Sequence, residues 1–278
     1  MLRASPSGGC WVRVIVAFLL GAGDLLPMPT QAWVRFRNTN LFLALCVATF
    51  FATIFLATTS ASAQTCAGGG SYSITGADNA TCALGAGDSV TISNTGSVTA
   101  NPGVSIPGLV TAVNVTNNGT ITSLGGSAIL FQNNSAVTAG INNNGRIEAG
   151  ANGAGISIGA STFAGGVSNA GIITAADFGI YLHNVTTFTG GIINSSTGTI
   201  TSGSIGSAGT EGIRLDGPMT FSGGINNAGA ISAMGPGILL QNITTFTDGI
   251  TNSCTAARFL RHPADLIQAA NFTAAVAF

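Results

Sequence analysis

The chain has 278 residues, of which 8 are basic and 9 acidic, so charged residues make up only 6% of it, against roughly 25% in an ordinary globular protein. Its hydrophobic share of 46% excludes intrinsic disorder, which needs low hydrophobicity or high net charge. The sequence contains no lysine and has a net charge of −1. We therefore expect no nucleic-acid partner, because phosphate binding needs clustered basic side chains.

Residues 1–27 contain a short apolar stretch over 14–20, followed by Asp24 and Pro27. They precede a segment that would by itself begin as a conventional export signal at Met28. We therefore hypothesise that translation starts at Met28 and that residues 1–27 are an over-extended leader. A peptide covering residues 11–24 in the unprocessed precursor would contradict this hypothesis.

Residues 28–63 have the composition of a secretory signal peptide. An apolar run over 41–57 is preceded by Arg35 and Arg37 and followed by small residues that end at Ala63. A basic flank, an apolar core and a small-x-small site predict cleavage after Ala63. The alternative is a membrane anchor, for which the apolar run is short. We expect the protein to contact a membrane only through this segment.

Cys66 and Cys82 are the only cysteines between the predicted cleavage site and Ser253. In an exported protein such a pair predicts a disulfide that closes a short loop. Two free thiols are the alternative. Because a solenoid needs its open end covered, and repeats begin at residue 96, we expect residues 64–95 to form an N-terminal cap.

Residues 96–253 contain a repeat of about 26 residues, marked by a glycine with asparagine two positions before it. A period in this range is typical of a solenoid, whose units bury apolar surface only by stacking. Each unit has three apolar patches with alternating polarity, and no helical periodicity competes with them. We therefore predict an all-β fold, a parallel β-helix with about 25–26 residues and three short strands per coil. The marker glycines are Gly96, Gly119, Gly145, Gly171, Gly198 and Gly229.

Stacking of the coils should place equivalent residues in columns along the axis. Isoleucines would fill the interior, and an asparagine column would accept left-handed backbone geometry and pass hydrogen bonds from coil to coil. We read this column as structural; a ligand site is the alternative. The predicted aromatic stack is Phe163, Phe188, Phe221 and Phe246, and the predicted asparagine column is Asn94, Asn117, Asn143, Asn169, Asn227 and Asn252.

The signal peptide, the Gly/Asn/Thr-rich repeats and phrases such as residues 221–233 (FSGGINNAGAISA) resemble the passenger domain of an autotransporter, a Gram-negative surface protein exported through its own C-terminal barrel. The resemblance covers about residues 64–253 and is compositional and periodic. It implies export through the periplasm to the cell surface, outer membrane or medium. It also implies an adhesive role, with a host or matrix surface or a polysaccharide as partner.

Residues 254–278 share nothing with the repeat. Cys254 stands where glycine is expected, and Arg258 and Arg261 follow closely. We hypothesise a frameshift or truncation near residues 253–254, so that the family's barrel is missing; a capping segment is the alternative. The alternation of apolar residues over 272–278 loosely matches the last strand of an outer-membrane barrel. A truncated product without function is a further alternative.

Acidic residues in the repeats are scattered, apart from one cluster of Glu211, Arg214 and Asp216 beside the enlarged stretch 201–210. Long loops on rigid scaffolds often carry function, so this cluster is the candidate surface-binding loop. The alternative is that these charges lie on a solvated loop and have no binding role. His183 has no metal-ligating residues at suitable spacing. We expect no catalytic, cofactor or metal site, and the alternative is a carbohydrate-active enzyme acting through Glu211 and Asp216.

Overall fold

The computed structural model describes residue 66 and residues 69–108, 112–138, 140–203, 211–217 and 219–253, together with four short strands nearer the two ends of the chain. The chain divides into two units, Met1–Ser60 and Ala61–Phe278. In the first unit, β1 (Arg3–Ala4), β2 (Cys10–Val12) and β3 (Val34–Arg35) form an antiparallel sheet. The apolar run 41–57, the predicted cleavage site and most of residues 254–278 lie outside the described residues. No helix in the described part of the chain is long and apolar enough to cross a membrane.

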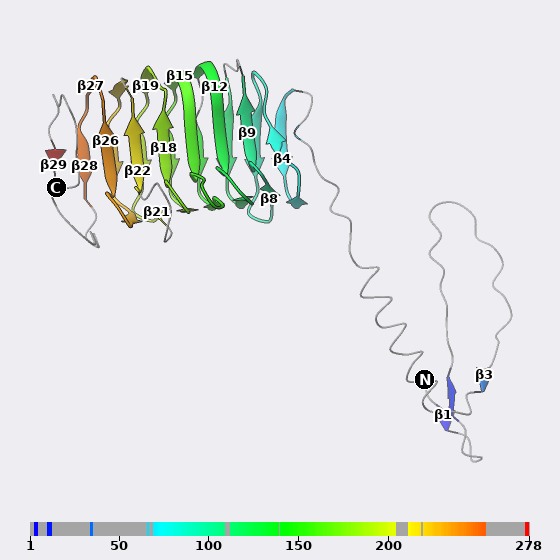
Figure 1. Ribbon diagram of the computed structural model, residues 1–278. Coiled ribbons are helices and arrows are strands. Elements are labelled where there is room, and N and C mark those ends of the chain that lie inside the picture. The colour runs from blue at the N-terminus through cyan, green and yellow to red at the C-terminus, as the bar shows by residue number, and fades with distance from the viewer. Residues whose placement is uncertain are drawn as a thin grey trace. The chain divides into compact units, whose positions relative to one another are not determined.

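The second unit is a parallel β-solenoid in which the strands line up in three sheets (Figure 1). Each complete coil contributes at least one strand to each sheet, and every strand pair in these sheets is parallel. This confirms the predicted all-β fold. We call the sheets I, II and III in the order in which a coil passes through them.

Sheet I precedes the marker glycines. Its outermost strand, β29 in the C-terminal segment, pairs in parallel with β28. The strands are β4 (Ser71–Ile74), β7 (Ser89–Ile92), β10 (Asn114–Asn117), β13 (Ile141–Asn143), β16 (Val167–Asn169), β20 (Ile192–Asn194), β24 (Ile225–Asn227), β28 (Ile250–Asn252) and β29 (Val276–Ala277).

Sheet II follows the marker glycines and carries the predicted isoleucine column. Ile121, Ile147, Ile173, Ile200 and Ile231 are paired in register from coil to coil. The strands are β5 (Ala77–Asp78), β8 (Ser97–Ala100), β11 (Thr120–Ser123), β14 (Arg146–Glu148), β17 (Ile172–Ala175), β21 (Thr199–Ser202) and β25 (Ala230–Ala233).

Sheet III holds the longest strands and, in the later coils, a fourth short strand per coil. A residue with left-handed φ interrupts each later strand, as at Asn184 (φ 55°) and Asn242 (φ 58°), and the chain then resumes as β19, β23 or β27. The main strands are β6 (Cys82–Ala83), β9 (Val104–Pro107), β12 (Ile129–Thr138), β15 (Ile156–Ala164), β18 (Ile180–His183), β22 (Ile213–Asp216) and β26 (Ile238–Gln241). The continuing strands are β19 (Thr187–Thr189), β23 (Thr220–Ser222) and β27 (Thr245–Phe246).

The predicted phenylalanine stack lies in the solenoid interior, along the end of β15 and the continuing strands β19, β23 and β27. Phe163, Phe188, Phe221 and Phe246 are fully buried, and successive ring centroids are 5.3, 4.8 and 5.0 Å apart with nearly parallel planes. Offset aromatic pairs at such distances add to the stabilisation that burial itself provides. The stack therefore links the coils along the axis.

The asparagine column also exists, but with one member different from the prediction. Asn194 belongs to it, pairing with Asn169 and Asn227, whereas Ile92 occupies the position expected for Asn94. The cause is the turn length: two extra residues separate both Ile92 and Asn194 from their marker glycines, so counting back two positions from glycine misses the column. The column asparagines do not have left-handed backbone geometry, which the structure instead places at residues such as Asn184 and Asn242.

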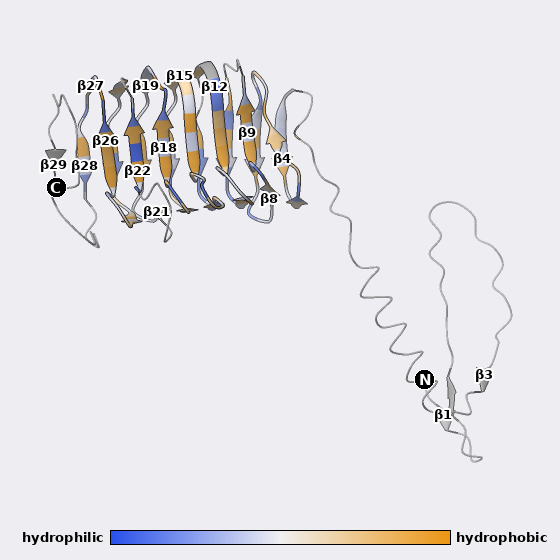
Figure 2. Cartoon of the chain, in the orientation of Figure 1, coloured by the Kyte–Doolittle hydropathy of each residue, from blue (hydrophilic) through white to orange (hydrophobic). Residues whose placement is uncertain are grey.

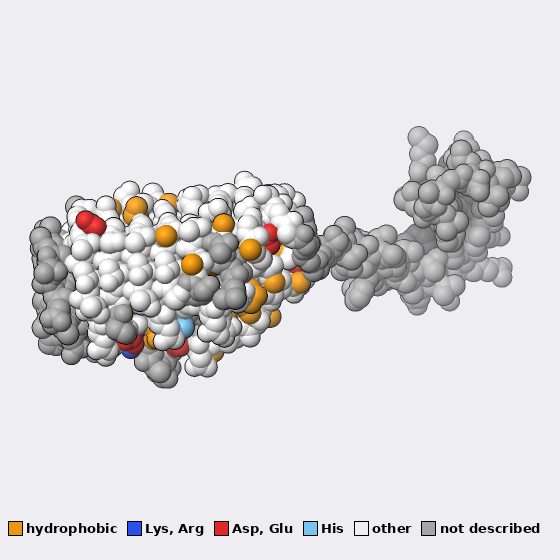
Figure 3. Space-filling model, turned by 90° about the horizontal axis from the view of Figure 1, so that it is seen from above, with side chains coloured by type: hydrophobic (Ala, Val, Ile, Leu, Met, Phe, Trp, Pro, Cys, Tyr) orange, Lys and Arg blue, Asp and Glu red, His pale blue; other side chains and the backbone are white. Residues whose placement is uncertain are grey.

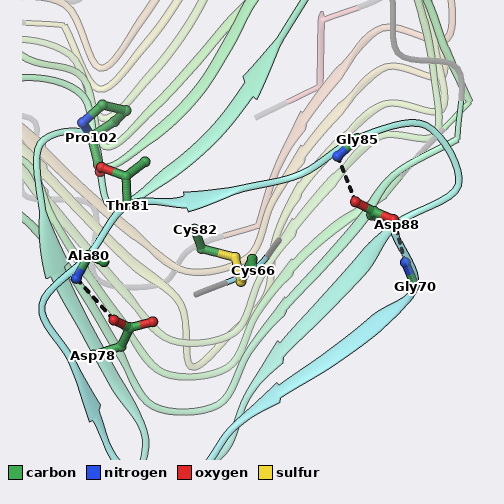
Figure 4. The surroundings of a disulfide bond; sticks show 9 residues. All are labelled: Cys66, Gly70, Asp78, Ala80, Thr81, Cys82, Gly85, Asp88 and Pro102. Carbon is green, nitrogen blue, oxygen red and sulfur yellow. Dashed lines mark hydrogen bonds between the residues drawn. A yellow bond between two sulfur atoms is a disulfide. The ribbon is translucent and has the colours of Figure 1, made fainter. Parts of the chain in front are cut away.

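Residues 64–95, expected to be a separate cap, already contain a coil. Strands β4, β5 and β6 pair in register with β7, β8 and β9. A disulfide joins Cys66 to Cys82 in this first coil, the pairing expected from the sequence (Figure 4). The Asp88 carboxylate accepts hydrogen bonds from the backbone amides of Gly70 and Gly85, at 2.6 and 2.7 Å. The first coil thus lacks the marker sequence, but a disulfide and side-chain hydrogen bonds stabilise it.

Candidate functional site

The candidate cluster lies on the outer face of sheet III, because burial alternates along the strands. In β22 the side chains of Ile213 and Leu215 point into the core, so Arg214 and Asp216 face outward. Figure 2 shows the resulting alternation of hydrophobic and hydrophilic segments along β22. Glu211 lies just before the strand. The prediction of a binding loop is therefore corrected: two of the three residues stand on a strand.

Arg214 connects the two acidic residues. One guanidinium nitrogen lies 2.7 Å from Asp216 Oδ2 and 3.1 Å from Gln241 Oε1, and another lies 3.5 Å from Glu211 Oε1. Glu211 is 8% exposed. The structure thus brings all three predicted residues together, and adds Gln241 of the next coil.

Aromatic side chains flank this ion-pair cluster on the preceding coil. The rings of Phe178 and Tyr181 stack with centroids 4.5 Å apart, and those of Tyr181 and His183 stack at 4.7 Å. Arg214 lies over both Phe178 and Tyr181, at 5.3 and 5.7 Å from the ring centroids, within the range of cation–π attraction. Sequence reasoning missed these aromatic residues, although aligning the second apolar patch of each repeat would have placed Tyr181 beside Arg214.

His183 is held as a neutral ring by its neighbours. The Asn184 amide nitrogen lies 3.2 Å from Nδ1 of His183, and Ser157 Oγ lies 3.2 Å from Nε2, so both ring nitrogens have hydrogen-bonding partners. Burial lowers the pKa of His183, and the charge of Asp216 offsets part of this shift. Burial and then Asp216 raise the pKa of Tyr181, so both rings are uncharged at neutral pH.

The guanidinium of Arg214 interacts with both Glu211 and Asp216, the two side chains that a glycoside hydrolase would need as acid and base. No group of three or more His, Cys, Asp or Glu side chains is placed to hold a metal ion within the described ranges. The cluster can present hydrogen-bonding groups and ring edges to a partner at the surface.

The other ion pair of the repeats, Arg146 with Glu148, lies on the outer face of sheet II, where Thr122 also contacts Glu148 at 3.3 Å. Both arginines of the repeats are thus neutralised by neighbouring carboxylates. In the view of Figure 3 most of the solenoid surface is neither charged nor hydrophobic; Arg, His and some acidic side chains lie along one rim, and other acidic side chains lie apart from it.

A scan against protein-family models, a search of curated proteins and a search of solved structures each find no match to this chain.

Proposed function

We propose that this chain is an exported, non-catalytic surface protein of the autotransporter passenger type, whose solenoid binds a host or matrix surface or a polysaccharide. The parallel β-solenoid and the signal-peptide sequence support this proposal together. A solenoid offers long outer faces that can serve as extended binding surfaces. On this view the outer faces are the functional part of the molecule.

The observation that carries the proposal is the chemistry of those faces. Outward positions hold mainly threonine, serine and asparagine, and each arginine of the repeats is paired with acidic neighbours. Such a surface binds through many weak, uncharged contacts spread over several coils. Affinity from repeated contacts of this kind suits adhesion to an extended surface.

A carbohydrate-active enzyme with its site at Glu211 and Asp216 is the alternative. Against it stands the ion pairing of Arg214 with both carboxylates, which a sugar would have to displace before the two could act on it. Loss of polysaccharide cleavage in Glu211→Gln would favour the enzyme. Binding without turnover would favour the surface protein.

The test is to express the full chain in a Gram-negative host and to measure two things: protease accessibility at the surface, and adherence of the cells to polysaccharide or matrix coats. We expect the chain to be exported, at the surface or into the medium, and to raise adherence to the coats above an empty-vector control, with loss of both in Ala63→Arg, which blocks the predicted cleavage. A folded, exported chain that increases adherence to none of the coats would contradict the proposal.

A further inference from the structure

A groove of 380 Å³ runs across the outer face of sheet I, away from the candidate cluster on sheet III. One side of it is a row of outward side chains from four successive coils, Thr116, Asn142, Ser168 and Ile193, which are paired in register. Strands in a sheet are about 4.8 Å apart, so four rows span about 14 Å. The groove therefore has the length of a short chain of ligand units rather than of one small molecule.

The hollow exists because glycines line its other side. A Cβ added to Gly166 would lie 2.4 Å from the carbonyl oxygen of Gly190, and one added to Gly190 would lie 2.7 Å from the amide nitrogen of Gly166. No side chain fits at Gly166 or Gly190, so at these positions the corner between sheets III and I does not rise beside the row of longer side chains. The fold thus keeps the groove open over these coils.

The lining selects an uncharged ligand. None of the described residues that line the groove carries a charge, and the side chains offer amides and hydroxyls that both donate and accept. Ile193, which is 46% exposed, adds an apolar contact. A polyanion or polycation finds no counter-charge in this lining, whereas a polyhydroxylated chain finds hydrogen-bonding partners and an apolar patch.

An extended peptide does not fit the same features. Peptides that add to a sheet need an edge with unpaired backbone groups. The floor of this groove lies inside sheet I, where Ile141 donates to Gly166 at 3.2 Å and Val167 donates to Gly191 at 3.0 Å. The backbone is already paired, so the side chains must provide the recognition.

We propose that the groove on sheet I between Asn114 and Ile193 is a binding site for an uncharged polysaccharide chain, lying along the solenoid axis. This inference rests on the proposed function, because an exported protein is the one that meets such polymers. It places the binding of the polysaccharide on sheet I, so the ion-pair cluster of sheet III is not part of the proposed site.

The test measures binding of the full chain to soluble dextran, β-glucan and galactomannan by affinity electrophoresis, with polygalacturonate as the charged comparison. Ser168→Trp fills the groove, and Asn142→Asp places a charge in it without changing its volume. Thr174→Trp, outward on sheet II of the same coil, is the matched control, and Arg214→Ala probes sheet III. Circular dichroism checks that each variant keeps its sheets.

We expect at least one uncharged polysaccharide to bind, and both groove variants to weaken it at least about tenfold while Thr174→Trp and Arg214→Ala stay within about twofold. Binding of polygalacturonate alone, or an equal loss in Thr174→Trp or Arg214→Ala, overturns the groove site. Adherence to a protein matrix without polysaccharide binding also overturns it, but leaves the proposed surface function standing. Absence of any adherence contradicts the proposed function itself.

Discussion

At the scale of single residues, the asparagine ladder explains how a column of polar side chains can be buried. Each Nδ2 donates to Oδ1 of the next column asparagine at 2.7–2.8 Å, from Asn117 through Asn143, Asn169 and Asn194 to Asn227 and on to Asn252. Several of these amides also donate to a backbone carbonyl in the next coil, that of the residue after the marker glycine there. Buried amides cost little only when they are bonded in this way.

Replacing one column asparagine should therefore destabilise the fold by more than the loss of its own hydrogen bonds, because its neighbours in the column lose partners too. We expect Asn169→Ala to lower the free energy of unfolding by about 2 kcal/mol or more, because in the core the Asn143 amide loses one of its two acceptors and Asn194 Oδ1 loses its ladder donor. The measurement is the midpoint of chemical denaturation. The matched control is Asn144→Ala, an exposed residue whose amide bonds Asn118, and it should change stability by less than about 0.5 kcal/mol. Equal effects of the two substitutions would contradict a structural ladder.

His183 should make stability depend on pH. Burial lowers its pKa in the folded state below the ordinary value, so the unfolded chain binds the proton more readily. Its contribution is fully present above about pH 6.5 and is lost as the pH falls through the folded-state pKa. We expect His183→Gln to flatten the decline of the denaturation midpoint between about pH 7 and pH 5. Parallel pH profiles of the variant and the unsubstituted chain would show that His183 is not held neutral.

The residue columns show which parts of the coil alignment can be predicted from the sequence and which cannot. The phenylalanine column from Phe163 to Phe246 can be aligned correctly from the sequence, because each phenylalanine stands at the same distance before a glycine. Asn94 was placed wrongly and Asn194 was missed, because a turn with two extra residues changes the count without changing the column. Register is set by pairing between coils, and a local motif does not contain that pairing.

At the scale of elements, the glycine corner between sheets III and I controls how closely the coils stack. Gly191 has a φ of 72°, and a Cβ there would lie 2.2 Å from the carbonyl oxygen of Gly223 in the next coil. Both the backbone conformation and the available space exclude a side chain. The same corner bounds the proposed groove, so its glycines serve stacking and surface shape together.

We expect Gly191→Ala to lower the free energy of unfolding by about 2 kcal/mol or more, because the new methyl group forces the coils apart at a left-handed position. Gly76→Ala is the matched control, since nothing lies within 4 Å of its added Cβ. Denaturation midpoints compare the two. A tolerant Gly191 would mean that the coils are spaced more widely at this corner.

The first coil should depend on its disulfide. The bond between Cys66 and Cys82 spans a sequence separation of 16, and closing a loop of this size stabilises the folded state by about 3 kcal/mol through the entropy of the unfolded chain. We expect the paired substitution to alanine to lower the free energy of unfolding by about that amount. Hydrogen exchange should show the loss first in β4 to β6. Unchanged protection of these strands would contradict a role for the disulfide in holding the terminal coil.

Elements were easier to predict than the candidate site. The three apolar patches per repeat indicated the sheets correctly, because alternation and turn residues are local signals. Glu211, Arg214 and Asp216 were recognised as neighbours in sequence, but their place on the sheet III face follows from the burial of Ile213 and Leu215. Phe178, Tyr181 and His183 join the site only through the pairing of β18 with β22.

At the scale of the whole molecule, the solenoid separates a packed interior from neutral outer faces. Columns of isoleucine, phenylalanine and asparagine bind coil to coil, while threonine, serine and asparagine face outward with the few charges paired. A molecule built in this way has extended surface to offer and few groups suited to acid–base catalysis. These features are the basis of the binding role proposed for its faces.

The most direct test of this assignment is the chain length of a bound polysaccharide, followed by light scattering during long incubation with the full chain. A surface-binding protein predicts saturable binding with unchanged polymer length. Shortening of the polymer that disappears in Glu211→Gln would contradict the account, because Glu211 would then act as a catalytic group rather than as a partner of Arg214.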